Sequence, residues 1–156
     1  MAGNGSYITE QKRKELETEL IDLKGPKRKE IIESLEYAKS LGDLSENAEY
    51  HQTREDQGKL EARIAQIEQI LQNAEVVARA GGELVNIGSF VTVQKEGGKG
   101  EKTYQVVGAL EADTLSGKIS NQSPIGLAMF GKKKGDKVSF KTPAGATVNY
   151  KITKVS

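Results

Sequence analysis

Two carboxylates in the first half of the chain, Asp43 and Glu46, are the residues whose type and spacing are best suited to chemistry. Mg²⁺ takes oxygen ligands and is usually held by one or two protein carboxylates together with substrate phosphates and water. A spacing of three at the start of a helix places both side chains near the same helix end. Two exposed carboxylates hold Mg²⁺ only weakly, so a metal site at these residues would need a partner to complete it.

The same segment also fits a structural role. Asp43-Leu44-Ser45-Glu46 has the pattern of a capping box, with Asp43 as the N-cap and Glu46 at the third helical position. In that arrangement both residues accept hydrogen bonds from backbone N–H groups. Capping boxes are common, so the spacing alone favours the cap over the metal. The two roles are compatible, because each carboxylate has two oxygens.

The rest of the composition excludes several other kinds of site. There is no cysteine and the only histidine is His51, which excludes disulfides, thiolate metal sites, zinc clusters and histidine-based triads. The glycines within 97–100 lack P-loop spacing and predict a hairpin loop. No apolar run reaches the roughly 18 residues of a membrane span, and residues 1–10 lack a secretory signal pattern. We expect a cytoplasmic protein with no membrane contact.

Charge is divided unequally along the chain. Residues 1–80 hold 12 Lys/Arg and 16 Asp/Glu, a net charge of −4, whereas residues 81–156 hold 11 and 6, a net charge of +5. The overall net charge of +1 hides this asymmetry. An acidic first half and a basic second half indicate a charged partner, and the basic half suits RNA or an acidic protein surface.

Apolar residues with helical spacing predict two long helices in the first half. Thr9 is a candidate N-cap, and Gly25-Pro26 predicts a kink or a phase shift in the first helix. The first apolar stripe comprises Leu16, Leu20, Leu23, Ile31, Leu35, Ala38 and Leu41. The second is a heptad seam that comprises Tyr50, Thr53, Gln57, Leu60, Ile64, Ile67, Leu71 and Ala74. The polar turn 42–45 predicts an antiparallel hairpin about 45 Å long, with the two carboxylates at its far end.

The pattern changes at Ala80-Gly81-Gly82, after which the period becomes two. Alternating runs between glycine and proline turns predict strands that contain Phe90, Val91, Val93, Tyr104, Val106, Val107, Val138, Phe140, Val148, Tyr150, Ile152 and Val155. Ser123 as N-cap and Pro124 at the first helical position predict one short helix. The predicted fold class is α+β, with an antiparallel coiled-coil domain over 1–80, its acidic tip at 42–49, and a sheet-plus-helix domain over 81–156.

Three stretches of the sequence carry a family resemblance. The first is the ten-residue segment Gly42–His51 at the predicted tip. The second combines residues 111–113, 119–120 and 123–125, and the third combines residues 131, 135–138 and 142–145. With the hairpin they cover nearly the whole chain, and in order and spacing they closely resemble the Gre family of bacterial transcript-cleavage factors. The net charge of −4 favours the GreA type, because the GreB type is expected to carry a broader basic patch on the coil.

The resemblance implies a C-terminal domain of FKBP-like fold that docks on bacterial RNA polymerase while the coiled coil enters the secondary channel. It implies that Asp43 and Glu46 are catalytic and share Mg²⁺ with the polymerase active site, which cleaves the 3′ end of backtracked nascent RNA. Arg54 matches a position that faces RNA, and Ser123 and Pro124 match a polymerase-binding turn. Without the resemblance, these three residues are an ordinary solvated arginine and an ordinary helix start. The implied protein is a monomer and an activator, not itself an enzyme.

Other functions remain open at this level. A Gre-like antagonist would occupy the channel and inhibit transcription without cleavage, although Asp43, Glu46, Asn47 and Glu49 agree with the cleaving members. An FKBP-like fold also suggests a prolyl isomerase, but fold does not carry function and such a site needs an aromatic-lined apolar pocket. A coiled-coil dimerisation module leaves the acidic tip unexplained.

Overall fold

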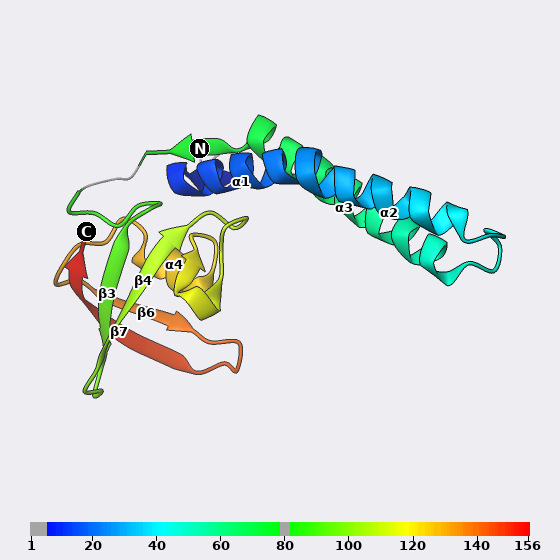
Figure 1. Ribbon diagram of the computed structural model, residues 1–156. Coiled ribbons are helices and arrows are strands. Elements are labelled where there is room, and N and C mark those ends of the chain that lie inside the picture. Colours follow the sequence, from blue (N-terminus) through cyan, green and yellow to red (C-terminus); the bar gives the residue numbers. More distant parts are fainter. Residues whose placement is uncertain (1–5, 79–81) are drawn as a thin grey trace. The chain divides into compact units, whose positions relative to one another are not determined.

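The structure is a computed structural model that describes residues 6–78 and 82–156 (Figure 1). Its contacts divide the chain into two compact units. The hairpin unit comprises Arg13–Asn73, and the sheet unit comprises the described residues of Met1–Lys12 and Ala74–Ser156. Of the boundary expected at Ala80-Gly81-Gly82, the first two residues lie outside the described part of the chain.

Two helical arms form the hairpin (Figure 1). The first arm consists of α1 (Glu10–Asp22), η1 (Leu23–Lys27) and α2 (Arg28–Ser40), and the second arm is α3 (Ala48–Asn73). The predicted heptad seam is confirmed, since every one of its members on α3 is buried or half-buried: Tyr50, Thr53, Gln57, Leu60, Ile64, Ile67 and Leu71. The apolar members lie toward the base of the hairpin, so the packing weakens toward the loop.

Charged side chains link the two arms along the edges of the seam. Arg63 Nε lies 2.7 Å from Glu19 Oε1, Arg28 Nη2 lies 2.8 Å from Glu61 Oε2, and Lys24 pairs with Glu68. Each of these pairs joins the first arm to the second. The side chains are partly exposed, so each pair contributes at most about 1 kcal/mol and favours this antiparallel alignment over shifted ones.

The interruption predicted at Gly25-Pro26 is confirmed as a π-helical turn. Pro26 lies inside η1, between α1 and α2, and the arm continues through it. A π turn inserts an extra residue into the helical repeat, which shifts the phase of every residue that follows. The arm can therefore place Leu16 in the seam before the proline and Leu35 in the seam after it, and both are buried.

Two short strands flank the hairpin in the sequence and pair with each other. β1 (Tyr7–Thr9) lies parallel to β2 (Glu75–Val77), with Tyr7 opposite Glu75. Neither strand was predicted. Thr9 ends β1 and caps α1, because its Oγ1 accepts a hydrogen bond from Lys12 N at 3.1 Å, as its N-cap position predicts. A Cβ at Gly108 would lie 1.8 Å from Tyr7 O, so only glycine admits β1 at this distance.

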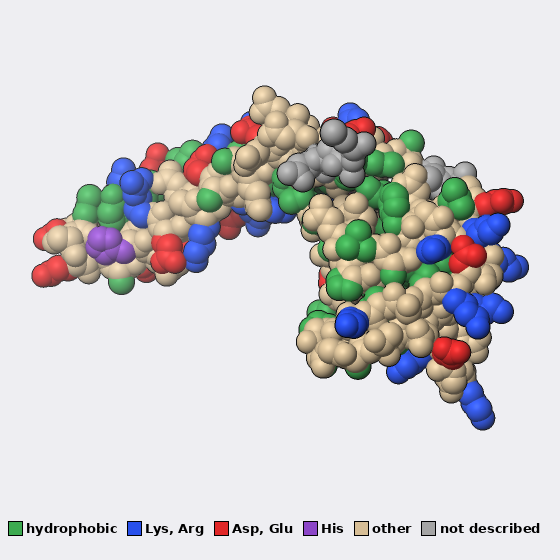
Figure 2. Space-filling model, turned by 180° about the vertical axis from the view of Figure 1, so that it is seen from behind, with side chains coloured by type: hydrophobic (Ala, Val, Ile, Leu, Met, Phe, Trp, Pro, Cys, Tyr) green, Lys and Arg blue, Asp and Glu red, His purple; other side chains and the backbone are tan. Residues whose placement is uncertain are grey.

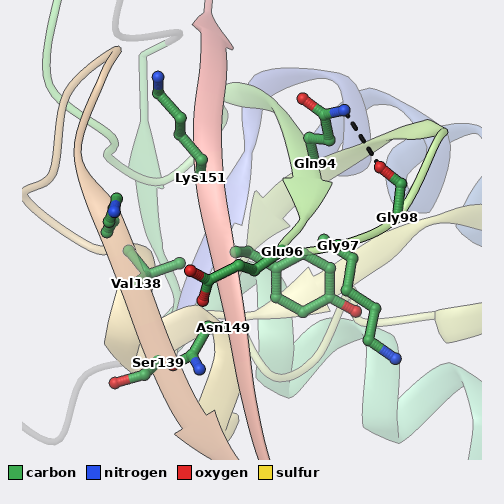
Figure 3. Close-up of a pocket in the computed structure, with 11 residues that line it drawn as sticks. Gln94, Glu96, Gly97, Gly98, Val138, Ser139, Asn149 and Lys151 are labelled. Carbon is green, nitrogen blue, oxygen red and sulfur yellow. Dashed lines mark hydrogen bonds between the residues drawn. The ribbon is translucent and has the colours of Figure 1, made fainter.

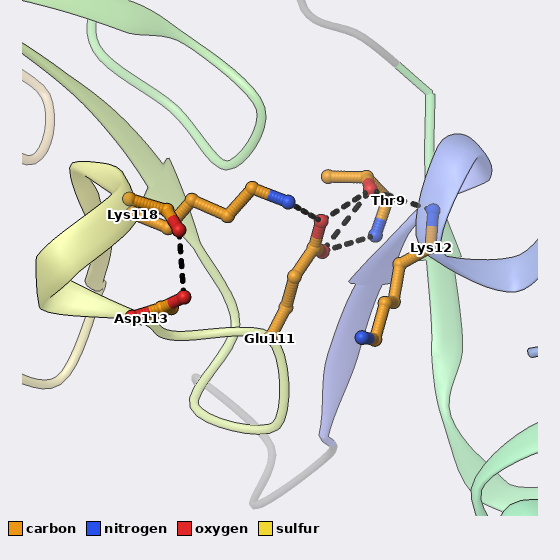
Figure 4. Close-up of polar contacts among 6 residues, drawn as sticks. Thr9, Lys12, Glu111, Asp113 and Lys118 are labelled. Carbon is orange, nitrogen blue, oxygen red and sulfur yellow. Dashed lines mark hydrogen bonds and ion pairs between the residues drawn. The ribbon is translucent and has the colours of Figure 1, made fainter. Parts of the chain in front are cut away.

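The buried carboxylate of Glu111 binds Thr9 at the end of β1 (Figure 4). Glu111 is 6% exposed, and its Oε2 accepts a hydrogen bond from Thr9 N at 3.1 Å while its Oε1 accepts one from Thr9 Oγ1 at 2.9 Å. Lys118 Nζ lies 3.5 Å from Oε1. A buried carboxylate is costly unless it is paired and hydrogen-bonded, and here both conditions are met. Glu111 therefore holds the start of α1 on the sheet unit.

The sheet unit is built on five strands in the order β5-β4-β3-β7-β6. They are β3 (Phe90–Lys95), β4 (Glu101–Val107), β5 (Lys118–Ser120), β6 (Lys137–Lys141) and β7 (Thr147–Val155), and β5 alone pairs in parallel. A short 3₁₀ helix, η2 (Thr114–Ser116), precedes β5, and α4 (Pro124–Met129) follows it. The core lies on the face that α4 covers and comprises Val85, Val91, Val93, Val106, Ile119, Met129, Val138 and Ile152.

The α+β class predicted from the change of period is confirmed. A helical hairpin precedes a mixed sheet with a short helix, and the predicted strand residues of the second half lie in β3, β4, β6 and β7. β5 and η2 were not predicted. In the part of the chain that the structure describes, none of the helices has the length and apolarity needed to cross a bilayer.

Candidate functional site at the hairpin tip

The loop between the arms holds the predicted acidic tip. Leu41 N–H donates to Ala38 O at 3.2 Å at the end of α2, and Gly42 then adopts a φ of +124°, which favours glycine. Asp43 shapes the residues that follow, because its Oδ1 accepts hydrogen bonds from Ser45 N at 3.0 Å and from Ser45 Oγ at 2.9 Å. An aspartate that bonds the backbone two residues later stabilises a turn without a helix.

Asn47 caps the second arm. α3 begins at Ala48, and Asn47 Oδ1 accepts a hydrogen bond from Tyr50 N at 3.0 Å, which is the N-cap arrangement. Asn47 Nδ2 donates to Ala38 O at 2.6 Å and ties the loop to the last turn of α2. The capping-box hypothesis for the two tip carboxylates is therefore wrong, because the helix starts after both of them and another residue supplies the cap.

Asp43 and Glu46 lie in one exposed loop, with oxygens left for a ligand. Both bonds that Asp43 accepts end on Oδ1, and among the described residues neither its Oδ2 nor the Glu46 carboxylate has a partner. The hydrogen bonds from Ser45, chiefly from its backbone N–H, lower the pKa of Asp43 below the usual value. This carboxylate is therefore ionised at neutral pH and well below it. Figure 2 shows acidic side chains gathered at this end of the hairpin.

The tip offers the type of ligand that Mg²⁺ binds, but too few ligands to hold the ion without a partner. Mg²⁺ binds hard oxygen ligands such as carboxylates. One or two protein carboxylates are usual in a Mg²⁺ site that also contains substrate phosphate. Within residues 6–78 and 82–156, no group of three or more His, Cys, Asp or Glu side chains is placed to hold a metal ion. The tip by itself therefore offers an incomplete site.

Other residues around the tip have more ordinary environments. Arg54 lies on α3, where its Nη1 donates to Gln57 Oε1 at 2.8 Å. Glu49 occupies the first turn of α3, where a negative charge interacts favourably with the helix dipole. Leu44 in the loop is 39% exposed and Leu41 is 51% exposed, so the tip also presents apolar surface.

The predicted docking residues, Ser123 and Pro124, lie on the sheet unit. Ser123 Oγ accepts a hydrogen bond from Gly126 N at 3.1 Å and caps α4, whose first residue is Pro124, so the predicted helix start is confirmed. The same helix exposes Leu127 (66%) and Phe130 follows it with 45% exposure. The sequence reasoning did not single out these two side chains, although their large apolar type at helical spacing was a usable signal.

Two protein-family models match this chain. The model described as "Transcription elongation factor, GreA/GreB, C-term" matches residues 80–156, and the model described as "Transcription elongation factor, N-terminal" matches residues 6–76. The chain is 43% identical over 151 residues to transcription elongation factor GreA of Listeria welshimeri, covering 96% of this chain and 94% of the relative. It is 44% identical over 147 residues to GreA of a Roseiflexus species, covering 93% and 94%. A solved structure of GreA factor homolog 1 from Thermus thermophilus has 25% identity, coverage of 98% and 99%, and a TM-score of 0.45.

Proposed function

Because the chain belongs to the GreA/GreB family of transcription elongation factors, we propose that it carries Asp43 and Glu46 through the secondary channel of bacterial RNA polymerase. There the two carboxylates support cleavage of the 3′ end of backtracked nascent RNA by the polymerase's own active site. One observation carries the proposal. The capping role falls to Asn47, which leaves both carboxylates exposed with oxygens available to a ligand.

The chain's own residues contribute position and charge. The two arms form a long support, and the Asn47 bonds to Tyr50 and Ala38 hold the loop against both arms. The hydrogen bonds from Ser45 lower the pKa of Asp43 and orient its carboxylate. Asp43 and Glu46 would help to hold a Mg²⁺ ion shared with the polymerase, and that ion would activate water and stabilise the leaving oxygen. Since the bond breaks at the polymerase active site, the chain is an activator without turnover of its own.

The remaining predicted residues have distinct parts in this function. Arg54 lies on α3 after the acidic turn, and we propose that it contacts the extruded RNA. Ser123 and Pro124 start α4, and we propose that this end of the helix docks on the polymerase. The exposed Leu127 and Phe130 suit such a contact, since apolar and aromatic side chains are typical of the centres of protein interfaces.

The test is an RNA cleavage assay on stalled, backtracked elongation complexes with Mg²⁺. The wild-type chain should accelerate removal of the RNA 3′ end, and Asp43→Asn and Glu46→Gln should each return the rate to that of the polymerase alone. Glu36→Gln is the matched control, because Glu36 is an exposed acid of the same hairpin. This variant should stimulate as well as the wild type. Competition between labelled wild-type chain and each variant for polymerase should show unchanged binding.

Two results would contradict the proposal. If Asp43→Asn and Glu46→Gln both stimulate cleavage normally, the carboxylates have no part in the reaction. If the wild-type chain binds polymerase and slows RNA synthesis without cleavage, it is an antagonist that occupies the channel. A prolyl isomerase is disfavoured in the pocket formed by residues 94–98, 137–139 and 149–151, because its residues are mainly charged or polar and include one aromatic residue, Tyr150.

A further inference from the structure

The sheet of the sheet unit has a polar face opposite its core. α4 and the core residues occupy one face, so alternate residues of β6 and β7 point to the other. The exposed side chains on that face are Lys137, Ser139, Lys141, Thr147, Asn149 and Lys151. Three of these six residues are lysines, two carry a hydroxyl group and one carries an amide, and none of the six carries a carboxylate. This part of the sheet therefore presents positive charge together with hydrogen-bond donors.

A groove of about 570 Å³ opens on this surface (Figure 3). It lies beside the end of β3, the hairpin loop at 96–98, and the middle of β6 and β7. The residues that line it include three lysines and three uncharged polar residues: Lys95, Lys137, Lys151, Gln94, Ser139 and Asn149. Lys137, Lys151 and Gln94 share the polar face, whereas Lys95 pairs with Tyr150 and belongs to the other face. Glu96 is its one acidic residue, and in Figure 3 the Glu96 side chain crosses in front of β7.

Two of these lysines lie opposite each other in the sheet. Lys137 and Lys151 are directly opposite in the β6–β7 ladder, and Gln94 is opposite Lys151 on the β3 side. Like charges directly opposite in a sheet are destabilising. Neither Lys137 nor Lys151 has an ion pair among the described residues. Local rules of this kind are broken at functional sites, so this pair is a reason to look for a function on this surface.

Protection of the sheet edge accounts for only part of this pattern. Lysines on an edge strand hinder pairing with another chain, which suits Lys137 and Lys141 on the edge strand β6. β7 lies between β3 and β6, so Lys151 is on an interior strand and protects no edge. Edge protection therefore does not explain why Lys151 lies opposite Lys137.

The composition of the groove favours nucleic acid over a protein partner. Protein interfaces are depleted in lysine and serine and enriched in aromatic residues, methionine and arginine, and this groove has the opposite composition except for Tyr150. Lysines with hydroxyl and amide side chains are the groups that contact phosphate and sugar. A basic groove that follows the backbone is how proteins bind single strands without sequence preference. We propose that the Lys137–Lys151 groove binds the phosphate backbone of single-stranded RNA, independently of the hairpin tip.

The experiment titrates the full-length chain into a short fluorescein-labelled oligouridine and follows fluorescence anisotropy between about 0.05 and 0.2 M salt. Each lost phosphate contact removes about 0.7 from the slope of log affinity against log salt for a single strand. Lys137→Gln/Lys151→Gln should therefore lower the slope by about 1.4 and weaken binding about 25-fold at roughly 0.1 M salt. Glu96→Gln should strengthen binding, by up to about fivefold on the same basis. A misfolded variant cannot produce that gain.

The matched control is Lys132→Gln/Lys134→Gln, which removes the same charge from exposed lysines of the α4–β6 loop outside the groove. It should lower the slope far less than the groove variant does. The proposal is overturned if the groove variant binds RNA like the wild type, or if the control loses as much. It is equally overturned if polyglutamate displaces the RNA at equal charge concentration, which would assign the groove to an acidic protein surface.

Discussion

Asn47→Ala should loosen the tip more than any other single truncation in the loop. The side chain makes two hydrogen bonds: Oδ1 accepts from Tyr50 N at 3.0 Å, and Nδ2 donates to Ala38 O at 2.6 Å. Loss of an asparagine cap costs about 1 kcal/mol, and a partly buried hydrogen bond contributes about 1 kcal/mol. The local free energy of opening should therefore fall by about 2 kcal/mol.

Asn47→Asp separates the two contributions. Aspartate is as good an N-cap as asparagine, so the Tyr50 bond is retained, whereas a carboxylate cannot donate to Ala38 O. This variant should lose about 1 kcal/mol, half of the loss expected for Asn47→Ala. We therefore expect the tip to be most stable in the wild type, less stable in Asn47→Asp and least stable in Asn47→Ala.

The assay is amide hydrogen exchange followed by NMR at Tyr50 and at an amide near the hairpin base. A loss of about 2 kcal/mol corresponds to roughly 30-fold faster exchange at Tyr50. Exchange near the base, for example at Ile67 in the buried seam, should change little because opening of the tip is local. Unchanged exchange at Tyr50 in Asn47→Ala would refute the cap, and equal losses in the two variants would refute the role of Ala38.

Three further predictions concern other parts of the chain. Gly58→Ala should raise the thermal midpoint, since Gly58 lies inside α3 with nothing within 4 Å of an added Cβ, and the gain is about 0.5–1 kcal/mol; a lower midpoint would contradict this. Glu111→Ala should cost about 2–3 kcal/mol in urea unfolding, because it leaves the buried N–H of Thr9 without its acceptor, and Glu111→Gln, which keeps one oxygen, should cost less. Ser45→Ala should raise the pKa of Asp43 toward its usual value in a carboxyl NMR titration, because one of the two hydrogen bonds that lower it is removed. With a lowered pKa, the stability that these bonds contribute is present above the usual aspartate pKa and is lost as the pH falls through the lowered one; an unchanged titration midpoint would rule out the Oγ contribution.

Local patterns predicted the helical hairpin and most of the sheet. A heptad seam depends on residues three and four apart, so the pattern on α3 appears in the sequence without knowledge of the partner arm. Caps are equally local, which is why Thr9 and Ser123 were predicted correctly. Alternation with a period of two likewise located β3 and β7.

Features that join distant segments were not predicted. β1 and β2 have three residues each and pair only because the hairpin returns the chain to its starting point. A three-residue strand is too short to show alternation. Glu111 belongs to a stretch with a family resemblance, but its burial against Thr9 depends on the position of β1. No spacing in the sequence reports that position.

At the tip, the sequence pattern predicted two carboxylates in a short polar turn between long helices. The sequence pattern predicted Asp43 as the cap of the second helix and did not single out Asn47, although asparagine is an equally good cap. In the structure, Asn47 caps the second helix. The Asn47 amide accepts from Tyr50 and donates to Ala38 O on the opposite arm at the same time, which an ionised aspartate cannot do, and that second bond exists only when the arms are folded together.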